Sequence, residues 1–364
     1  MGTGRNLLLY PFSLIYGLVT DIRNFLYNSG VLPSHEFRIP IICVGNITVG
    51  GTGKTPHTEY LVNLLRGNFK VAILSRGYKR KSRGFQIASA DSSVKNIGDE
   101  PLQIFRKFRD ILVAVDRDRV HGVKTILKEN PEIEVIILDD GFQHRSIKPG
   151  LSILLSDYNR PIVKDYLMPY GNLRESKKNI RRTDVILITK SPENISPIKR
   201  RIIIKEVNKA PYQDLYFTSF MYRDPLPVFA DNPSEKFTLA DLNPDKSGIV
   251  LVTGIANPGH LRDYLSKYFR EIIHLGFPDH RCFTERDIEK ISTVFNDLKS
   301  PLKFAFTTEK DAVRLREFTN IAEPLKLASY YIPVGVNFLN EDKPEFDKLI
   351  SDYVRKNKRN NRVS

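Results

Sequence analysis

Cysteine and tryptophan are scarce in this chain of 364 residues, which has two cysteines and no tryptophan. Two cysteines far apart, Cys43 and Cys282, exclude a disulfide scaffold and a cysteine-rich zinc module, and they suit a reducing compartment. The absence of tryptophan removes one common membrane-interface anchor. Apolar residues at 41% and charged residues at 27% are ordinary for a folded protein, so wholesale disorder is excluded.

Acidic residues are also few relative to basic ones. The chain has 42 Asp and Glu against 56 Lys and Arg, which gives a formal net charge of +14. Such an excess implies an anionic partner, which could be nucleic acid, anionic lipid or a phosphorylated substrate. Composition alone does not choose among the three.

A long apolar run is absent as well, because the uncharged N-terminal stretch at residues 7–20 is shorter than the about 20 residues that a spanning helix needs. Pro11 interrupts it, and no convincing signal-peptide cleavage site follows. Apolar residues recur at helical spacing, at Phe12, Ile15, Tyr16, Val19, Ile22 and Leu26. This pattern predicts an amphipathic helix, which either packs on its own domain or lies in a membrane interface.

Short runs of Val, Ile and Leu alternate with helical patterns along most of the chain. We expect strands at residues 39–44, 71–74, 111–115, 135–138, 152–155 and 185–189, and a helix over 58–65. Continuous apolar strands separated by helices indicate an α/β fold, with a parallel sheet covered by helices on both faces. The pattern loosens over residues 191–246, and a second block begins at 248–253, with strands near 271–275 and 303–307.

These patterns divide the chain into four parts. We expect an interfacial amphipathic helix at residues 1–28 and a P-loop NTPase-like domain at 29–240. A smaller C-terminal α/β domain follows at 241–350, and a frayed basic tail ends the chain at 351–364.

A glycine-rich loop is the strongest chemical signal in the sequence. The segment GNITVGGTGKT follows the first expected strand and precedes a helix, which is the context of a phosphate-binding loop. Glycines there let backbone N–H groups approach phosphate oxygens, Lys54 reaches the β- and γ-phosphates, and Thr55 places a hydroxyl on Mg²⁺. Thr48 stands where the strict pattern has glycine, and a plain glycine-rich turn is the alternative. The expected nucleotide-binding residues are Val49, Gly50, Gly51, Thr52, Gly53, Lys54 and Thr55.

An acidic pair follows the expected strand at 135–138. Four apolar residues before Asp139 and Asp140 are typical of a carboxylate that supports Mg²⁺ from the end of a buried strand. A simple turn after the strand is the alternative interpretation. Together with the loop, the pair indicates a P-loop NTPase or kinase that uses ATP and Mg²⁺.

Six further segments occur in a characteristic order: SRGY at 75–78, GDEP at 98–101, DDGFQH at 139–144, PYGNLRE at 169–175, FPDH at 277–280 and TEKD at 308–311. With the glycine-rich loop, they resemble the bacterial tetraacyldisaccharide 4′-kinase family, from the N-terminal helix to about residue 315. The resemblance implies transfer of the γ-phosphate of ATP to the 4′-hydroxyl of a tetraacyldisaccharide 1-phosphate, which gives lipid IVA in lipid A biosynthesis. It also implies a cleft between two domains, Mg²⁺, and work at the cytoplasmic face of the anionic inner membrane. We expect the chain to be a monomer.

The resemblance also implies roles for individual residues. Asp99 and His280 match the family's base dyad, although without the family Asp99 reads as a helix cap and His280 as a turn histidine. The remaining catalytic positions are Lys54, Asp139, Asp140 and Glu175, with Thr55, Asp139 and Glu175 as metal ligands. The expected substrate contacts are Arg76, Tyr78, Arg119, Gln143, His144, Asn172 and Arg174. Gln143 and His144 could equally fix the loop, and residues 308–311 contact the base or form a structural turn. Tyr170 and Asn172 depart from the usual residues of the family segment.

Two other classes of protein remain as alternatives. A P-loop ATPase or assembly factor would keep Lys54, Thr55 and Asp139, but it would have no need for Asp99, His280 or an apolar N-terminal helix. A nucleic-acid-binding protein could use the basic runs at 177–182 and 199–205. No zinc-finger spacing, RNP aromatic motif or helix-turn-helix signature supports that class, so we expect no nucleic acid partner.

Overall fold

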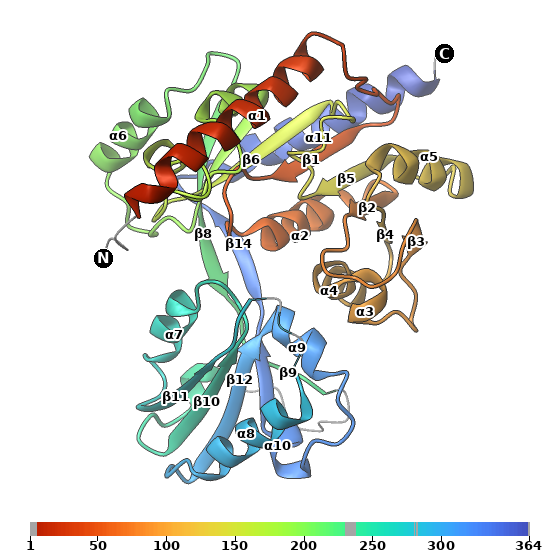
Figure 1. Ribbon diagram of the computed structural model, residues 1–364. Coiled ribbons are helices and arrows are strands. Elements are labelled where there is room, and N and C mark those ends of the chain that lie inside the picture. The colour runs from red at the N-terminus through yellow and green to blue at the C-terminus, as the bar shows by residue number, and fades with distance from the viewer. Residues whose placement is uncertain (1–5, 230–237, 280, 282, 363–364) are drawn as a thin grey trace.

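The computed structural model describes residues 6–229, 238–279, 281 and 283–362. It shows two bodies, an upper one built on a large sheet and a lower one built on a smaller sheet (Figure 1). Two strands, β8 (Asp214–Tyr222) and β14 (Val334–Phe338), lead from the first body toward the second.

The larger sheet has the strand order β14-β8-β7-β6-β1-β5-β2-β4-β3. Its remaining strands are β1 (Ile41–Gly45), β2 (Val71–Ser75), β3 (Gln86–Ile87), β4 (Leu112–Val115), β5 (Val135–Asp139), β6 (Leu151–Asp157) and β7 (Val185–Thr189). All neighbours pair in parallel except at the two edges, where β3 and β14 are antiparallel. The parallel α/β fold expected from the sequence is confirmed.

Helices cover both faces of this sheet. Ile42 and Val44 of β1 point into a core shared with α2 (Lys54–Leu65), α4 (Asp99–Lys107) and α11 (Lys343–Arg362). Ile41 and Cys43 point to the opposite face, which is covered by α5 (Arg119–Glu129). Successive strand residues face opposite sides, so burial on both faces requires the unbroken apolar runs seen in the sequence. The short α3 (Val94–Ile97) and α6 (Pro197–Val207) complete this body.

The second sheet has the order β11-β10-β12-β13-β9. Its strands are β9 (Leu226–Pro227), β10 (Ser247–Thr253), β11 (Glu271–Gly276), β12 (Leu302–Thr308) and β13 (Ser329–Ile332). Its helices are α7 (Gly259–Leu265), α8 (Glu285–Asn296), α9 (Glu309–Leu315) and α10 (Glu323–Leu327).

The end of the chain returns to the first body, which differs from the domain boundaries and the frayed tail expected above. Strand β14 pairs with β8, and α11 extends through Arg362. Phe346, Ile350 and Val354 of α11 lie in the core beside β1, at the i, i+4, i+8 spacing of one helix face. That apolar face keeps α11 on the larger sheet, so the second domain consists of about residues 226–333.

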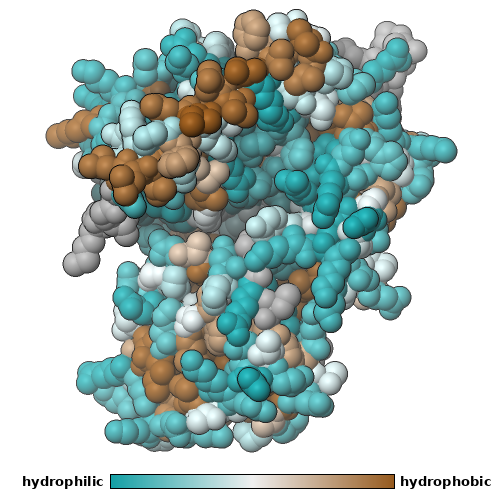
Figure 2. Space-filling model, viewed as in Figure 1, coloured by the Kyte–Doolittle hydropathy of each residue, from teal (hydrophilic) through white to brown (hydrophobic). Residues whose placement is uncertain are grey.

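The N-terminal helix α1 (Tyr10–Asn28) lies across the first body with its apolar side outward. Its buried residues are Ser13, Gly17 and Asn24. Large apolar side chains are exposed on it and on the preceding turn, at Leu7, Leu8, Phe12, Leu14, Ile15, Leu18, Val19, Ile22 and Phe25. Figure 2 shows these as brown groups over the upper body. No helix within the described residues is long and apolar enough to cross a bilayer.

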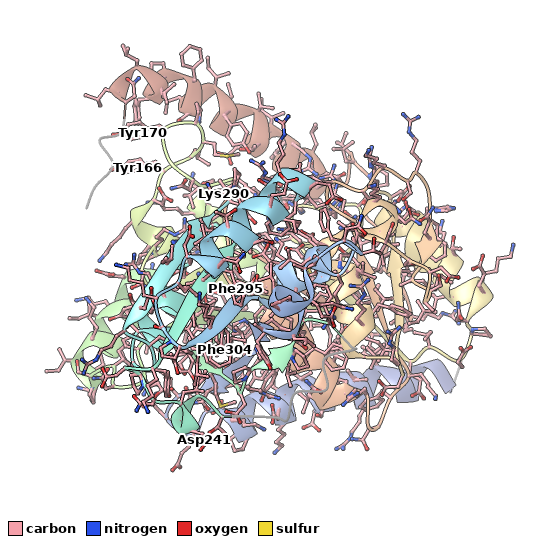
Figure 3. The ribbon with its side chains drawn as sticks, turned by 90° about the horizontal axis from the view of Figure 1, so that it is seen from below. Tyr166, Tyr170, Asp241, Lys290, Phe295 and Phe304 are labelled. Carbon is pink, nitrogen blue, oxygen red and sulfur yellow. The ribbon has the colours of Figure 1, made fainter. Side chains whose placement is uncertain are left out.

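The inner side of α1 is fixed by polar contacts. The Ser13 hydroxyl donates to the Leu167 carbonyl oxygen at 2.9 Å and accepts from the Tyr170 N–H at 2.8 Å. The Tyr170 ring meets the rings of Tyr10 and Tyr166 edge-on, and Figure 3 shows Tyr166 and Tyr170 beside this helix. The helix is therefore inverted relative to an ordinary surface helix, which buries its apolar side.

Candidate active site

The glycine-rich loop joins β1 to α2, as the sequence predicts. Gly50 and Gly53 have φ of +99° and +90°, a left-handed backbone that glycine adopts without strain. A Cβ on Gly53 would lie 2.9 Å from Cζ of Phe220. The loop is fixed from below because Asn46 Nδ2 donates to Thr52 Oγ1 at 2.9 Å, and Thr189 Oγ1 donates to the Thr52 carbonyl at 2.8 Å.

The expected acidic pair lies beside this loop, because β5 is the parallel neighbour of β1. Asp139 is buried, and Thr58 Oγ1 donates to its carboxylate at 3.2 Å. Burial, with the nearby Glu100 and Asp140 charges, raises the pKa of Asp139 to about 7. A carboxyl group with so little solvent needs a cation to stabilise its ionised form.

Asp140 has a different environment from its neighbour. Its φ is +51°, and its Oδ1 lies 3.8 Å from Nζ of Lys54. Burial raises the pKa of Asp140, but the charges of Lys54 and Arg174 more than offset this and lower it. Oδ1 is buried and has no hydrogen-bond partner among the described residues. The pair therefore places the ionised carboxylate of Asp140 and the buried carboxyl group of Asp139 next to the phosphate loop.

Several of the expected substrate contacts surround Asp140. Arg174 Nη1 lies 3.5 Å from Asp140 Oδ2 and 3.4 Å from Gln143 Oε1, and Gln143 Nε2 donates to the Asn46 carbonyl. Burial, then the charges of Arg119 and Arg76, lowers the pKa of His144 to about 4, so its imidazole is neutral at pH 7.

Arg119 is fully buried in this group. Its Nη1 donates to the Asp116 carbonyl at 2.6 Å, while Nε and Nη2 have no partner in the described part of the chain. Burial lowers its pKa to about 10 even though Asp140 and Asp139 act in the opposite direction. Because the guanidinium has no exposed surface, it acts as a buried positive charge near Asp140 and Asp139. Arg76 and Tyr78 are exposed on the loop after β2.

Two expected residues are held by other contacts. Asn172 Nδ2 donates to Asp165 at 3.1 Å, and its carbonyl accepts from the Val49 N–H at 2.8 Å, so it braces the phosphate loop. Glu175 accepts from Arg182 Nη2 at 2.5 Å and from Asn24 of α1 at 3.3 Å, and burial raises its pKa. We expected Glu175 to be a metal ligand. In the structure its carboxylate instead joins α1 to the larger domain through these two contacts.

A cleft between the two domains begins at the phosphate loop. From the first domain it is lined by residues 51–56, Glu100, Gln103, Lys190 and Phe220, and from the second by Ile255, Ala256, Asn257, His260, Thr308, Glu309 and Lys310. Sequence reasoning missed Lys190 and Asn257; the position of Lys190 directly after a buried strand was the available signal. Thr308 and Asp311 also cap α9, so this segment both lines the cleft and forms a turn.

Asp99 lies at the start of α4, facing the second domain. Its carboxylate pairs with Arg314 of α9 and lies 3.8 Å from Nζ of Lys310. Its expected partner His280 falls outside the described residues.

The sheet, the phosphate loop and the acidic pair define a P-loop α/β phosphotransferase with a second domain closing the cleft. The sequence model of the family described as tetraacyldisaccharide-1-P 4′-kinase matches residues 5–355. The chain belongs to this family.

Individual relatives agree with this assignment. A tetraacyldisaccharide 4′-kinase of Bacteroides thetaiotaomicron is 47% identical over 98% of this chain and 95% of its own length. One of Flavobacterium johnsoniae is 40% identical over 96% of this chain and 97% of its own. The crystal structure of LpxK from Aquifex aeolicus in complex with ATP has a TM-score of 0.71 and 29% identity, covering 95% of this chain and 98% of that one.

Proposed function

We propose that this chain transfers the γ-phosphate of ATP to the 4′-hydroxyl of a tetraacyldisaccharide 1-phosphate, which gives lipid IVA. The observation that carries the proposal is the cleft between two domains of a chain from this kinase family, which the phosphate loop lines together with Glu100 and Lys310. The acidic pair lies next to this loop, with Asp140 3.8 Å from Lys54. A monomer at the cytoplasmic face of the inner membrane is part of the proposal.

The residues present fit ATP and Mg²⁺. Gly51 has open space around it, since no heavy atom of a described residue lies within 4 Å of a Cβ built there, and this leaves room for a phosphate. No group of three His, Cys, Asp or Glu in the described ranges could hold a metal alone. Mg²⁺ in nucleotide sites uses one or two protein oxygens, with phosphate and water supplying the rest. Thr55 and Asp139 are the proposed protein ligands.

Each residue of the site then has one task. Lys54, now 3.8 Å from Asp140, binds the transferred phosphoryl group, and Asp140 holds the ammonium in place until nucleotide arrives. Bound Mg²⁺ would neutralise phosphate charge. Asp99 accepts the proton of the 4′-hydroxyl, which is a poor nucleophile while protonated. Arg174 binds phosphate oxygens of the substrate, and the fully buried Arg119 adds positive charge near Asp140.

The inverted helix α1 supports action at a membrane surface. A row of exposed apolar side chains on a single helix is costly in water and is stabilised when it enters the interface of a bilayer. The net charge of +14 adds attraction to anionic lipid, at roughly 1 kcal/mol per basic residue near the surface. Of the two alternatives left by the sequence, this orientation favours the interfacial helix.

Transfer of labelled γ-phosphate to tetraacyldisaccharide 1-phosphate in detergent micelles tests the reaction. We expect Mg²⁺-dependent formation of a bis-phosphorylated lipid, and a loss of about 10³-fold or more for Lys54→Ala, which keeps its fold because Lys54 is outside the core. ATP hydrolysis without lipid phosphorylation would instead support the ATPase alternative. Near-normal turnover by Lys54→Ala would contradict the role given to the phosphate loop.

A further inference from the structure

The end of strand β7 holds the backbone of the phosphate loop. Thr189, the last residue of β7, donates from Oγ1 to the Thr52 carbonyl at 2.8 Å. Lys190, the next residue along the chain, donates from Nζ to the Gly51 carbonyl. Two consecutive residues at the end of a strand therefore bind two consecutive carbonyl groups of the loop.

Lys190 is itself held in place by a buried partner. Its Nζ lies 2.8 Å from Asp157 Oδ2, and the two side chains are 8% and 3% exposed. Asp157 ends β6 and lies opposite Thr189 in the register of the two parallel strands. The φ of Lys190 is +55°, a left-handed backbone that lysine rarely adopts and that often marks a functional position. These contacts fix a buried nitrogen atom at one point beside the loop, whereas most lysine side chains extend into solvent.

The direction of each carbonyl group determines the direction of the N–H group in the same peptide unit. A trans peptide bond is planar, so the Thr52 N–H points away from the Gly51 carbonyl, and the Gly53 N–H points away from the Thr52 carbonyl. Because both carbonyls face the end of β7, both N–H groups face the opposite side of the loop. Backbone N–H groups are what such a loop offers to phosphate oxygens, whereas a carbonyl turned to that side would repel them.

We propose that Thr189 and Lys190 are positioning residues, which hold two peptide units of the loop with their N–H groups toward the β-phosphate of the nucleotide. Asp157 acts through Lys190 by holding its Nζ at the Gly51 carbonyl. The inference rests on the proposed function only for the premise that the loop binds a nucleotide with a β-phosphate. Glycine leaves the backbone free to rotate, so a glycine-rich loop without these two donors has no fixed direction for its N–H groups.

Direct binding of phosphate by Lys190 is the alternative, because this residue also lines the cleft. Thr189 separates the two roles. Its side chain is fully buried, so it reaches a nucleotide only through the backbone of the loop. If orientation of the peptide units is what matters, loss of the Thr189 hydroxyl has the same kind of effect as loss of Lys190 Nζ. If Lys190 binds phosphate directly, loss of the hydroxyl has no effect on nucleotide affinity.

Equilibrium binding of MgATP, MgADP and AMP to the full chain tests the proposal. In Lys190→Met, which keeps the length of the side chain but removes its donors, we expect ATP and ADP to bind about 10- to 30-fold more weakly. Thr189→Val, which has nearly the same shape, should weaken both by about 5-fold. AMP has no β-phosphate, so its affinity, measured by competition, should stay within about 2-fold in both variants. A general disruption of the fold would instead weaken all three nucleotides.

Ser191→Ala is the matched control, because Ser191 is a buried hydroxyl beside Lys190 that donates to the Ile188 carbonyl and not to the loop. We expect it to lower the melting temperature about as much as Thr189→Val while the affinity for ATP and ADP stays at the wild-type value. Unchanged ADP affinity in Thr189→Val would overturn the proposal, and so would a loss in Lys190→Met that is much larger for ATP than for ADP.

The charge of Asp157 decides how the Lys190 variant folds. Lys190→Met leaves this buried carboxylate with Arg160, whose Nη2 is 4.0 Å away. If that variant does not fold, the double variant Asp157→Asn/Lys190→Met removes both charges together and should show the same loss for ATP and ADP. Wild-type ADP affinity in the folded double variant would overturn the proposal.

The same measurements separate this inference from the proposed function. If the wild type binds MgADP but phosphorylates no lipid, the proposed reaction fails, and the pattern of nucleotide affinities still decides the role of Thr189 and Lys190. If the wild type binds neither MgATP nor MgADP, the nucleotide premise is wrong and both fail.

Discussion

The outward side of α1 should control membrane binding without contributing to stability. Leu14 and Leu18 point away from the body, with 58% and 62% of each side chain exposed. We therefore expect the double variant Leu14→Ser/Leu18→Ser to bind anionic vesicles more weakly and to unfold at nearly the same temperature as wild type.

The expected magnitude follows from the exposed fractions. Complete burial of a leucine side chain stabilises by about 1.5–3 kcal/mol, so transfer of about 60% of each into the bilayer interface contributes about 1–1.5 kcal/mol. Loss of both corresponds to about 2–3 kcal/mol, which is roughly a 30- to 150-fold fall in the partition coefficient.

Co-sedimentation with vesicles containing anionic lipid, together with thermal melts, measures both quantities. Ser13→Ala is the matched control on the inner side of the same helix, since Ser13 bonds the Leu167 carbonyl and the Tyr170 N–H. We expect this control to lose about 1–3 kcal/mol of stability, because it leaves buried polar groups unpaired, and to bind vesicles as wild type does. An unchanged partition coefficient for the folded double variant would refute the reasoning.

Two further predictions concern the site. Gly53→Ala should cost about 1–3 kcal/mol of stability, because φ is +90° and the new Cβ meets Phe220. It should also lower MgATP affinity about 10-fold or more in equilibrium binding. Gly51→Ala is the control, and equal destabilisation of the two variants would contradict the strain argument. His57 is buried between the Gly53 carbonyl and the Thr218 hydroxyl, and burial lowers its pKa from 6.5 to about 4. As the pH falls, His57 is therefore protonated in the unfolded chain before it is protonated in the folded protein. The contribution of neutral His57 to the free energy of unfolding is complete above about pH 6.5 and falls by about 3 kcal/mol as the pH drops to 4. Asp139 and Glu59, whose pKa values are raised, change stability with pH in the opposite direction. Urea unfolding of wild type and His57→Gln at pH 7.5 and pH 5 separates the effects, because the carboxyl contributions cancel in the difference between the two unfolding free energies. A difference that does not change with pH would exclude this assignment.

The parallel strands could be predicted because the signal for each is local. A strand buried on both faces must be apolar over nearly its whole length, and β1, β2, β5 and β7 are apolar up to their last residue. Strands β8 and β14 could not be recognised in this way. β8 lies in the stretch of loose pattern, with several partly exposed positions, and its antiparallel partner begins more than a hundred residues later, at Val334. Only the paired structure shows that the chain returns to its first domain.

The residues of the candidate site likewise include some that a local sequence pattern predicts and others that only a distant contact reveals. The phosphate loop and the acidic pair are each continuous in sequence, so residue type and spacing were sufficient to find them. The contact between Arg314 and Asp99 spans 215 positions, and no local pattern encodes it.

The orientation of α1 shows why the apolar pattern alone could not choose between packing and membrane binding. The pattern gives an apolar side, but the side that packs is decided by small and polar residues: Ser13, Gly17 and Asn24. The same helix contacts segments of the candidate site, since Tyr16 donates to the Arg174 carbonyl, Arg23 to the Gln143 carbonyl, and Asn24 to Glu175. Under the proposed function, α1 would enter the bilayer on one side and contact the proposed substrate-binding segments on the other, which would place the cleft at the level of the lipid headgroups. A substrate held in the membrane by its acyl chains would then present its sugar to the phosphate loop without leaving the bilayer.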